Sequence, residues 1–332
     1  MRSMFKTMQD HLSRGEALVL VTVTASSGAT PRGAGARMLV GKDGRICGTI
    51  GGGAVEYRAI QVAGTVLQEQ TSLDRNFCLN RKDVENLGMI CGGDVDVFFQ
   101  YIPAGDAAAM ALTEEAERCF AAGRGLWFLS DIRTGSKMGL YTAEEGFWGI
   151  EAPEGLTPTR QPVRFGNWFV EQINTEGRVY VFGGGHVAQE LVPVLAHVGF
   201  RCVVMDDREE FTRKELFPDA EQIVQGDMCR IGDYLHIGEE DYVCVMTRGH
   251  AYDTVVQAQL LRCHPCYCGV IGSRHKAAGV RKVLKEEHGL TDEELDRVTT
   301  PIGLEIGAET PAEIAISICA QMIAHRARRS GR

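Results

Sequence analysis

The fold of the second half of this chain is decided by the stretch Val179-Tyr180-Val181-Phe182-Gly183-Gly184-Gly185-His186-Val187-Ala188. A short apolar strand runs into glycines that match the pattern G-x-G-x-x-A, and a helix-like segment follows. Asp206 ends the next expected strand about 20 residues later, where an acid accepts a ribose hydroxyl in dinucleotide-binding domains. Strand, turn, helix, strand and acid together predict a Rossmann-type domain. The expected cofactor contacts are Gly183, Gly185, His186 and Asp206.

The rest of the second half continues this alternation of strand and helix. Apolar strands rich in β-branched residues are expected at 178–182, 201–206, 242–246 and 267–271. The alternation predicts an α/β fold with a parallel sheet and crossover helices. A last helix, expected at 311–327, begins at Thr310-Pro311 with good capping residues. It is apolar on most faces, so we expect it to be buried.

Two glycine-rich segments distinguish the first half, at 24–38 and 48–56. Glycine is favoured where the backbone passes close to a ligand or adopts a positive φ. The first segment offers Ser27, Gly28 and Arg32 as cofactor contacts.

In the second segment, Gly51, Gly52 and Gly53 lead into a helix-like run. The first turn of that helix is expected to present free N–H groups, which form an anion site. Glu56 lies in the same turn. It is either a further cofactor contact or an acid that complements the helix dipole.

These segments belong to an expected N-terminal α/β cofactor domain. We expect a strand at 17–23, a hairpin at 37–49, a helix from Ala54, a strand at 95–101, and a helix plus strands between 104 and 148. Three prolines, Pro153, Pro158 and Pro162, mark a linker. The predicted domains are therefore 1–165, with the linker, and 166–332.

Two loops follow expected strands at the edge of the sheet where such folds bind ligands. The first contains Arg248 and His250, and the second contains Ser273 and Arg274. Arg248 is suited to a phosphate and His250 to proton transfer. A solvated helix-entry loop explains the same residues, and both interpretations stay open.

Cysteines suggest two further sites. Cys91, between apolar residues and paired glycines, is either a thiolate that contacts a soft metal centre or a small buried hydrophobe. Cys263, Cys266 and Cys268 form C-x-x-C-x-C, which suits a metal or redox site but also packing at the start of a strand.

Composition excludes several classes of protein. The 332 residues include 35 basic and 44 acidic ones, for a net charge of −9, which argues against a nucleic-acid partner. No apolar run reaches the ~20 residues of a membrane helix. The N-terminus lacks the apolar core of a signal peptide, and eleven cysteines are expected to be reduced thiols, so we expect a cytoplasmic protein.

The segments quoted above, taken together, resemble the xanthine dehydrogenase accessory family, XdhC/CoxI. The resemblance covers nearly the whole chain in family order, and the matching segments are 27–38, 48–56, 91–93, 182–188, 204–208, 269–274 and 301–308. The first-half glycine segments and Pro301-Ile302-Gly303-Leu304 are specific to the family, whereas the Rossmann turn is not. The chain departs from the family pattern at Arg248-Gly249-His250, where His-Asp-His is frequent, and at His275, where a second Arg is frequent. These departures leave the anionic ligand open.

The resemblance implies an accessory protein that binds the molybdenum cofactor, as molybdopterin or its dinucleotide form. Such a protein guards the cofactor while a cysteine desulfurase supplies the terminal sulfur, and delivers it to a molybdenum hydroxylase such as xanthine dehydrogenase. It is a carrier and not a catalyst. Cys91 is then the candidate contact to the metal centre.

Two other functions stay open. An NAD-dependent oxidoreductase would use His250 or His186 as proton donor, with Cys91 structural. A metal or thiol redox protein would use Cys263, Cys266 and Cys268. The apolar C-terminal helix permits a homodimer without requiring one.

Overall fold

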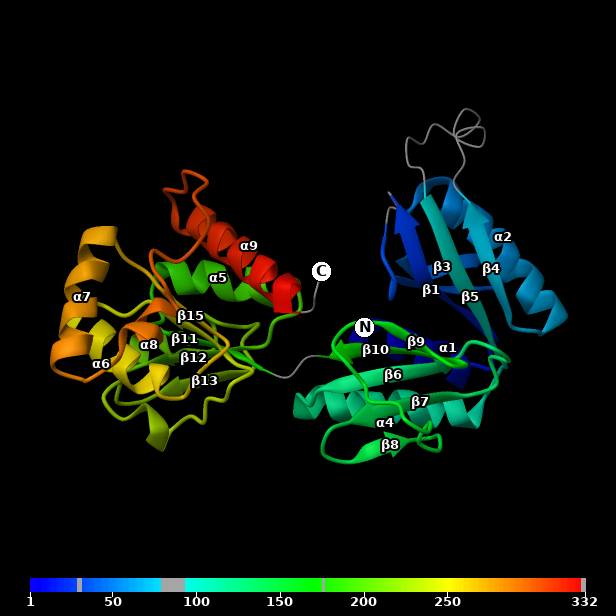
Figure 1. Cartoon of the computed structure of the whole chain (residues 1–332), viewed down its shortest axis with the longest axis horizontal. Coiled ribbons are helices and arrows are strands. Elements are labelled where there is room, and N and C mark those ends of the chain that lie inside the picture. Colours follow the sequence, from blue (N-terminus) through cyan, green and yellow to red (C-terminus); the bar gives the residue numbers. More distant parts are fainter. Residues whose placement is uncertain (29–31, 79–92, 175–176, 330–332) are drawn as a thin grey trace. The chain divides into compact units, whose positions relative to one another are not determined.

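The computed structural model describes residues 1–28, 32–78, 93–174 and 177–329. The chain divides into two compact units, Met1–Thr175 and Glu176–Arg332 (Figure 1). No helix in these described ranges is both long enough and apolar enough to cross a lipid bilayer.

The second unit is built on a six-stranded parallel sheet. Its strand order is β13-β12-β11-β14-β15-β16. The four strands that the sequence predicts are confirmed as β11 (Val179–Phe182), β12 (Cys202–Asp206), β14 (Tyr242–Val245) and β15 (Tyr267–Val270). The sequence did not reveal the two edge strands, β13 (Gln222–Gln225) and β16 (Val298–Thr299). The order is that of a dinucleotide-binding Rossmann sheet, so the predicted fold class is confirmed.

Helices cover both faces of this sheet and enclose two cores. Helices α5 (His186–His197) and α9 (Pro311–Arg329) pack together over one face (Figure 1). The other face is covered by α6 (His250–Leu261), α7 (Arg274–Glu286) and the short α8 (Asp292–Asp296). Two 3-10 turns, η1 (Glu209–Phe211) and η2 (Ile231–Asp233), complete the unit.

The last helix departs from its prediction. Only one face of α9 is buried, through residues such as Ile318 and Met322. Ile316 is 55% exposed and Ile323 is 38% exposed. The expectation of a buried helix was wrong because an apolar sequence does not reveal which faces find a partner.

The first unit contains two five-stranded antiparallel sheets. One has the order β3-β2-β1-β5-β4, with β1 (Leu18–Gly28), β2 (Arg37–Gly41), β3 (Gly44–Thr49), β4 (Leu73–Cys78) and β5 (Gly93–Ile102). The other has the order β8-β7-β6-β10-β9, with β6 (Leu126–Asp131), β7 (Met138–Thr142), β8 (Gly146–Trp148), β9 (Val163–Phe165) and β10 (Trp168–Asn174). Because β10 pairs with β6, it lies in the first unit, although the sequence suggested a second domain from residue 166.

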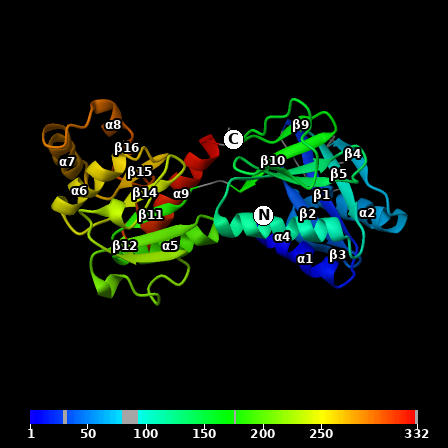
Figure 2. The same cartoon turned by 90° about the horizontal axis from the view of Figure 1, so that it is seen from below.

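Successive side chains of β1 point to opposite faces of the sheet and so enter two different hydrophobic cores. Val19, Val21 and Val23 face α2 (Gly53–Glu69), whereas Leu18 and Leu20 face the second sheet. Helices α1 (Arg2–Ser13) and α4 (Ala107–Ala122), which Figure 2 shows side by side, pack into that second core. The predicted strand, hairpin and helix of residues 17–69 are thus confirmed, and α1 is an addition.

A buried ion pair links the two sheets. Arg37 on β2 pairs with Glu171 on β10, and their side chains are 1% and 6% exposed. The Arg37 Nε donates to the Thr22 hydroxyl at 3.2 Å, and the guanidinium lies 5.0 Å from the centre of the Phe128 ring. Burial lowers the pKa of Arg37 to about 9, so the side chain stays charged at neutral pH.

We predict that Glu171→Ala destabilises the first unit by about 3–5 kcal/mol, because it leaves the Arg37 charge buried without a partner. Replacing both residues with methionine should restore most of that loss. Urea unfolding followed by tryptophan fluorescence measures this unit alone, because Trp127, Trp148 and Trp168 all lie in it. Equal stability of the single and double variants would contradict the prediction.

Candidate functional site

The glycine turn after β11 is shaped by contacts within the second unit. Gly183 has φ +109°, and a Cβ there would overlap the carbonyl oxygen of Met246. A Cβ on Gly184 would overlap the carbonyl oxygen of Phe211. Gly185 has φ −68°, and a Cβ there would meet nothing within 4 Å. Two of the glycines therefore serve packing, and only Gly185 faces open space.

Asp206 is close to this turn, as the sequence predicts, but its carboxylate already has partners. Oδ2 accepts the Gly184 amide at 2.7 Å, and Oδ1 accepts the Arg208 amide at 3.0 Å. The Arg208 guanidinium donates to both oxygens at 2.9 Å. Burial alone would raise the pKa of Asp206, but these hydrogen bonds outweigh it and lower the pKa.

The Arg208 side chain covers the Asp206 carboxylate. Its guanidinium stacks on the Phe211 ring, with Cζ 3.8 Å from the ring centre. The remaining cavity between Gly183, Asp206 and Arg248 is about 20 Å³, enough for a water molecule. A ribose must displace Arg208 before Asp206 can accept its hydroxyl. Arg208 stands two residues after the acid, but residue spacing does not predict that its side chain folds back onto Asp206.

The two polar loops lie at the carboxyl ends of neighbouring strands, as expected. Arg248 follows β14, is exposed and lines the small cavity. Ser273 caps α7, because its hydroxyl accepts the Lys276 amide at 3.2 Å. His250 and Arg274 begin α6 and α7, and their side chains lie outside the described part of the structure. His186 is exposed at the first position of α5.

The glycine turn of the first unit binds the carboxylate of a nearby side chain, Glu56. The Glu56 carboxylate accepts the Ile50 and Gly52 amides at 3.1 Å each, and the Thr49 hydroxyl. The Arg45 guanidinium donates to it at 2.7 Å. The Gly51 amide donates to the Thr49 hydroxyl oxygen at 3.1 Å. The amides of Ile50, Gly51 and Gly52, just before the first turn of α2, are therefore bound by side chains of the same segment.

Glu56 is only 8% exposed, and its carboxylate stays ionised. Burial alone would raise its pKa, but the hydrogen bonds from Thr49, Gly52 and Ile50, and the charge of Arg45, lower it instead. Gly51, Gly52 and Gly53 all have positive φ, of 132°, 74° and 58°. These glycines thus let the turn wrap around a carboxylate of the same chain.

The first glycine segment meets the start of β5. Ser27 pairs with Asp94, and Gly28, with φ +72°, pairs with Gly93. Arg32 is exposed. Cys91 lies outside the described residues, so its predicted contact with a metal centre stays a prediction.

The cysteines of the second unit lie apart from other metal-ligating side chains in the described structure. No group of three metal-ligating side chains occurs within the residues that the structure describes. Cys263 is exposed, Cys266 lies 3.4 Å from the Glu240 carbonyl oxygen, and Cys268 is buried in the sheet. Burial raises the pKa of all three thiols, to about 12 for Cys268, which disfavours the thiolate that a metal requires.

Known proteins resemble this chain along its length. A family model described as the XdhC and CoxI family matches residues 11–75, and one described as the XdhC Rossmann domain matches residues 179–322. A probable xanthine dehydrogenase subunit from Bacillus subtilis (strain 168) is 27% identical, over 98% of either chain. The molybdenum cofactor insertion chaperone PaoD of Escherichia coli (strain K12) is 21% identical, over 98% of this chain and 88% of its own.

A solved structure shares the whole fold. The crystal structure of a xanthine dehydrogenase from Bacillus halodurans matches 98% of this chain and 96% of its own, with a TM-score of 0.79 and 24% identity. The fold of both units therefore occurs together in a known protein.

We predict that Glu56→Gln lowers the free energy of unfolding of the first unit by about 1–3 kcal/mol at pH 7, because a neutral amide replaces a carboxylate that accepts several hydrogen bonds. The folded pKa of Glu56 is lowered, so its contribution is complete above the unfolded pKa of about 4.3 and is lost as pH falls further. The difference from wild type should shrink at pH 3. Glu69→Gln, an exposed position at the end of α2, is the matched control. Equal effects of the two substitutions on tryptophan-monitored unfolding would refute the assignment.

A second prediction separates packing from ligand contact at the Rossmann turn. Gly183→Ala should destabilise the second unit by ~2 kcal/mol or more, because it combines positive φ with an overlap. Gly185→Ala should change its stability by less than about 0.5 kcal/mol. If a dinucleotide phosphate approaches this turn, Gly185→Ala should nevertheless abolish its binding. Circular dichroism melts and NADH fluorescence titrations measure the two effects. Unchanged NADH binding by Gly185→Ala would place the nucleotide elsewhere.

Proposed function

The chain belongs to the XdhC and CoxI family, and we propose that it is an accessory factor that binds the molybdenum cofactor and inserts it into a molybdenum hydroxylase of the xanthine dehydrogenase type. The observation that carries this proposal is the similarity to the PaoD insertion chaperone over 98% of this chain. The two family models also fall on different units in chain order, so both units contribute family-specific residues.

The residues at the N-terminus of α5 suit the anionic tail of a cofactor. The amides of Gly185 and His186 begin this helix, and they have no acceptor among the described residues. Helix N-termini favour phosphate through these amides and through the helix dipole. Arg248 is exposed beside the same turn and adds positive charge. This turn is therefore our preferred phosphate contact, for the bare or the dinucleotide form.

The amides of Gly51 and Gly52 fit a phosphate less well. Glu56 already provides the negative charge that these amides attract, and it would repel a second anion. A role of Gly51, Gly52, Gly53 and Glu56 in cofactor binding therefore requires Glu56 to leave the turn. The same holds for Asp206, which must exchange Arg208 for a ribose hydroxyl.

Cys91 supplies the proposed contact to the metal centre, because a thiolate is a good ligand for a soft metal. We propose that this contact protects the cofactor while a cysteine desulfurase supplies sulfur. Delivery then passes the cofactor to the hydroxylase. The proposal places the chain in the cytoplasm, permits a homodimer, and assigns no catalytic residue.

An NAD-dependent oxidoreductase is the second candidate, favoured by the strand order of the second unit and by Asp206 at the end of β12. His250 or His186 would then be the proton donor. Arg208 weakens this candidate because it occupies the carboxylate that would hold the ribose. Titration with NADH, with substrate turnover as a further readout, distinguishes an oxidoreductase from a carrier.

We predict that the purified chain retains about one molybdenum per chain when incubated with isolated molybdenum cofactor under anaerobic conditions and ultrafiltered, as expected for tight binding. Cys91→Ala should abolish or greatly weaken retention while costing roughly 1 kcal/mol at most in stability. Cys263→Ala, at an exposed cysteine, is the matched control and should retain the cofactor.

The outcomes of this experiment test the carrier function and the Cys91 contact separately. No retention by a folded wild-type chain would refute the carrier function and favour a nicotinamide-dependent reaction. Retention by Cys91→Ala equal to wild type would refute the metal contact alone. An unfolded Cys91→Ala variant would show that the thiol is a packing residue.

A further inference from the structure

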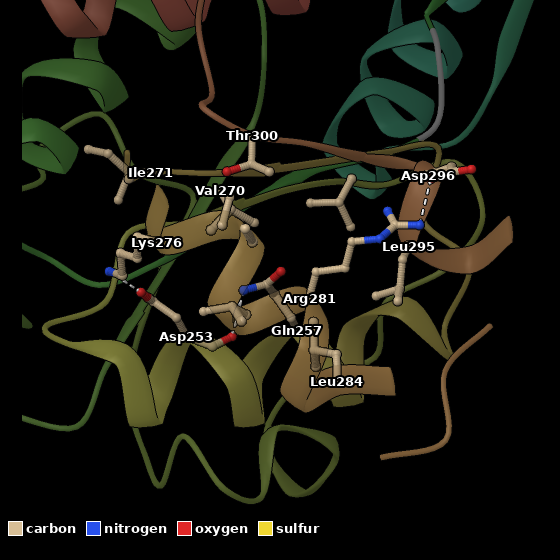
Figure 3. A pocket seen from close by; sticks show the side chains of 15 residues that line it. Asp253, Gln257, Val270, Ile271, Lys276, Arg281, Leu284, Leu295, Asp296 and Thr300 are labelled. Atoms are coloured by element: carbon tan, nitrogen blue, oxygen red, sulfur yellow. Dashed lines mark hydrogen bonds and ion pairs between the residues drawn. The ribbon is translucent and has the colours of Figure 1, made fainter. Parts of the chain in front are cut away.

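The second unit contains a cavity that no sequence motif marks. It has a volume of about 290 Å³ and lies between α6 and α7, where β15 ends (Figure 3). Known small-molecule pockets have volumes of roughly 300–1,000 Å³, so this one suits a compact ligand. Aliphatic side chains form much of its wall, namely Val270, Val280, Leu284, Leu295 and Val298. Such walls favour the apolar surface of a ligand.

Charged pairs close the two ends of the cavity. Figure 3 shows Lys276 and Asp253 at one end, Arg281 and Asp296 at the other, and Gln257 between them. Asp253 is fully buried; its carboxylate accepts the Thr247 hydroxyl at 2.5 Å and lies 2.5 Å from the Lys276 Nζ. The buried carboxylate holds the ammonium group in place. An ammonium group has three donors, so Lys276 can also donate to a ligand carbonyl.

Gln257 presents an acceptor to the cavity. The side chain is 3% exposed, and its Nε2 donates to the Asp253 carbonyl oxygen at 3.0 Å. A backbone carbonyl only accepts, so this bond determines which end of the amide is nitrogen. Oε1 is the other end of this amide, and it accepts no hydrogen bond from the described residues. A ligand N–H group would satisfy it.

Arg281 offers a site for an anionic substituent. Its guanidinium pairs with Asp292 at 3.0 Å and with Asp296 at 2.8 Å. These acids have side chains that are 58% and 71% exposed, so the pairs are weak and can be exchanged. A phosphate would form stronger, bidentate hydrogen bonds with the same arginine.

From this arrangement we propose that the cavity binds a phosphorylated molecule with an oxopyrimidine ring, as purinone nucleotides and pterin phosphates have. The ring N–H donates to Gln257, the adjacent carbonyl accepts from Lys276, the ring packs on the aliphatic wall, and the phosphate reaches Arg281. The inference rests on this cavity alone and not on the proposed cofactor function.

Calorimetric titration of the full chain with inosine monophosphate and adenosine monophosphate tests the proposal. Both have a purine ring and a phosphate, but adenine has an acceptor and an amino donor where hypoxanthine has an N–H and a carbonyl. Inosine monophosphate should bind at least about tenfold more tightly, because its ring N–H can donate to the Gln257 Oε1 whereas adenine presents an acceptor there. Equal affinity, or no binding of inosine monophosphate and neopterin alike, would overturn the proposal.

Variants locate the site. Gln257→Leu should weaken inosine monophosphate binding about tenfold while preserving the melting curve, because leucine has a similar volume and suits the aliphatic wall. Gln189→Leu is the matched control; Gln189 lies on α5 and donates to the Gly184 carbonyl oxygen beside the Rossmann turn. Loss of binding in Gln189→Leu instead of Gln257→Leu would move the ligand to that turn.

Two further arms identify the source of the ring and the role of the phosphate. Neopterin has the same carbonyl and N–H edge without a phosphate. Tighter binding of neopterin than of inosine would indicate a pterin ligand, and tighter binding of inosine would indicate a purinone ligand. Arg281→Ala, a change at a partly exposed side chain, should weaken the binding of inosine monophosphate and leave the binding of inosine unchanged. Equal weakening of both would contradict the phosphate contact.

Discussion

At each of the two glycine-rich turns, a carboxylate of the chain itself binds the backbone amides. Glu56 accepts the Ile50 and Gly52 amides in the first unit, and Asp206 accepts the Gly184 amide in the second. Each carboxylate is also paired with an arginine, Arg45 or Arg208. Buried amides need acceptors, and these side chains provide them without a ligand. The two turns are therefore stable structures before any cofactor binds.

Because carboxylates of the chain already bind these amides, an external anion cannot bind at either turn without rearrangement. At either carboxylate, a phosphate would have to replace a group that is already charged and hydrogen-bonded, at a cost of about 1–3 kcal/mol for each acceptor left unmatched. The start of α5 carries no such cost, because the amides of Gly185 and His186 have no acceptor in the described structure.

Sequence predicted the secondary structure that depends on local pattern. Short apolar strands, the hairpin after Arg37 and the turn at Gly183 follow from residue spacing, and all are present. Long-range pairing was not predictable in the same way. Strand β10 pairs with β6 across an intervening proline-rich segment, and Glu56 folds back on its own turn. The acids of the site were recognised, but their partners depend on tertiary contacts that spacing does not encode.

A segment that is specific to the family need not be a segment that contacts a ligand. The segment 301–308 is among the most specific, yet its structure is explained by packing: a Cβ on Gly269 would overlap Ile302, and Gly303, with φ +101°, exchanges two hydrogen bonds with the Gln321 amide of α9. Gln257 belongs to no recognisable motif, yet it lines a cavity and its Oε1 accepts no hydrogen bond from the described residues. Because folding satisfies most buried polar groups, a ligand is recognised by those that folding leaves unsatisfied. The density of glycine alone therefore does not identify a ligand contact in this chain.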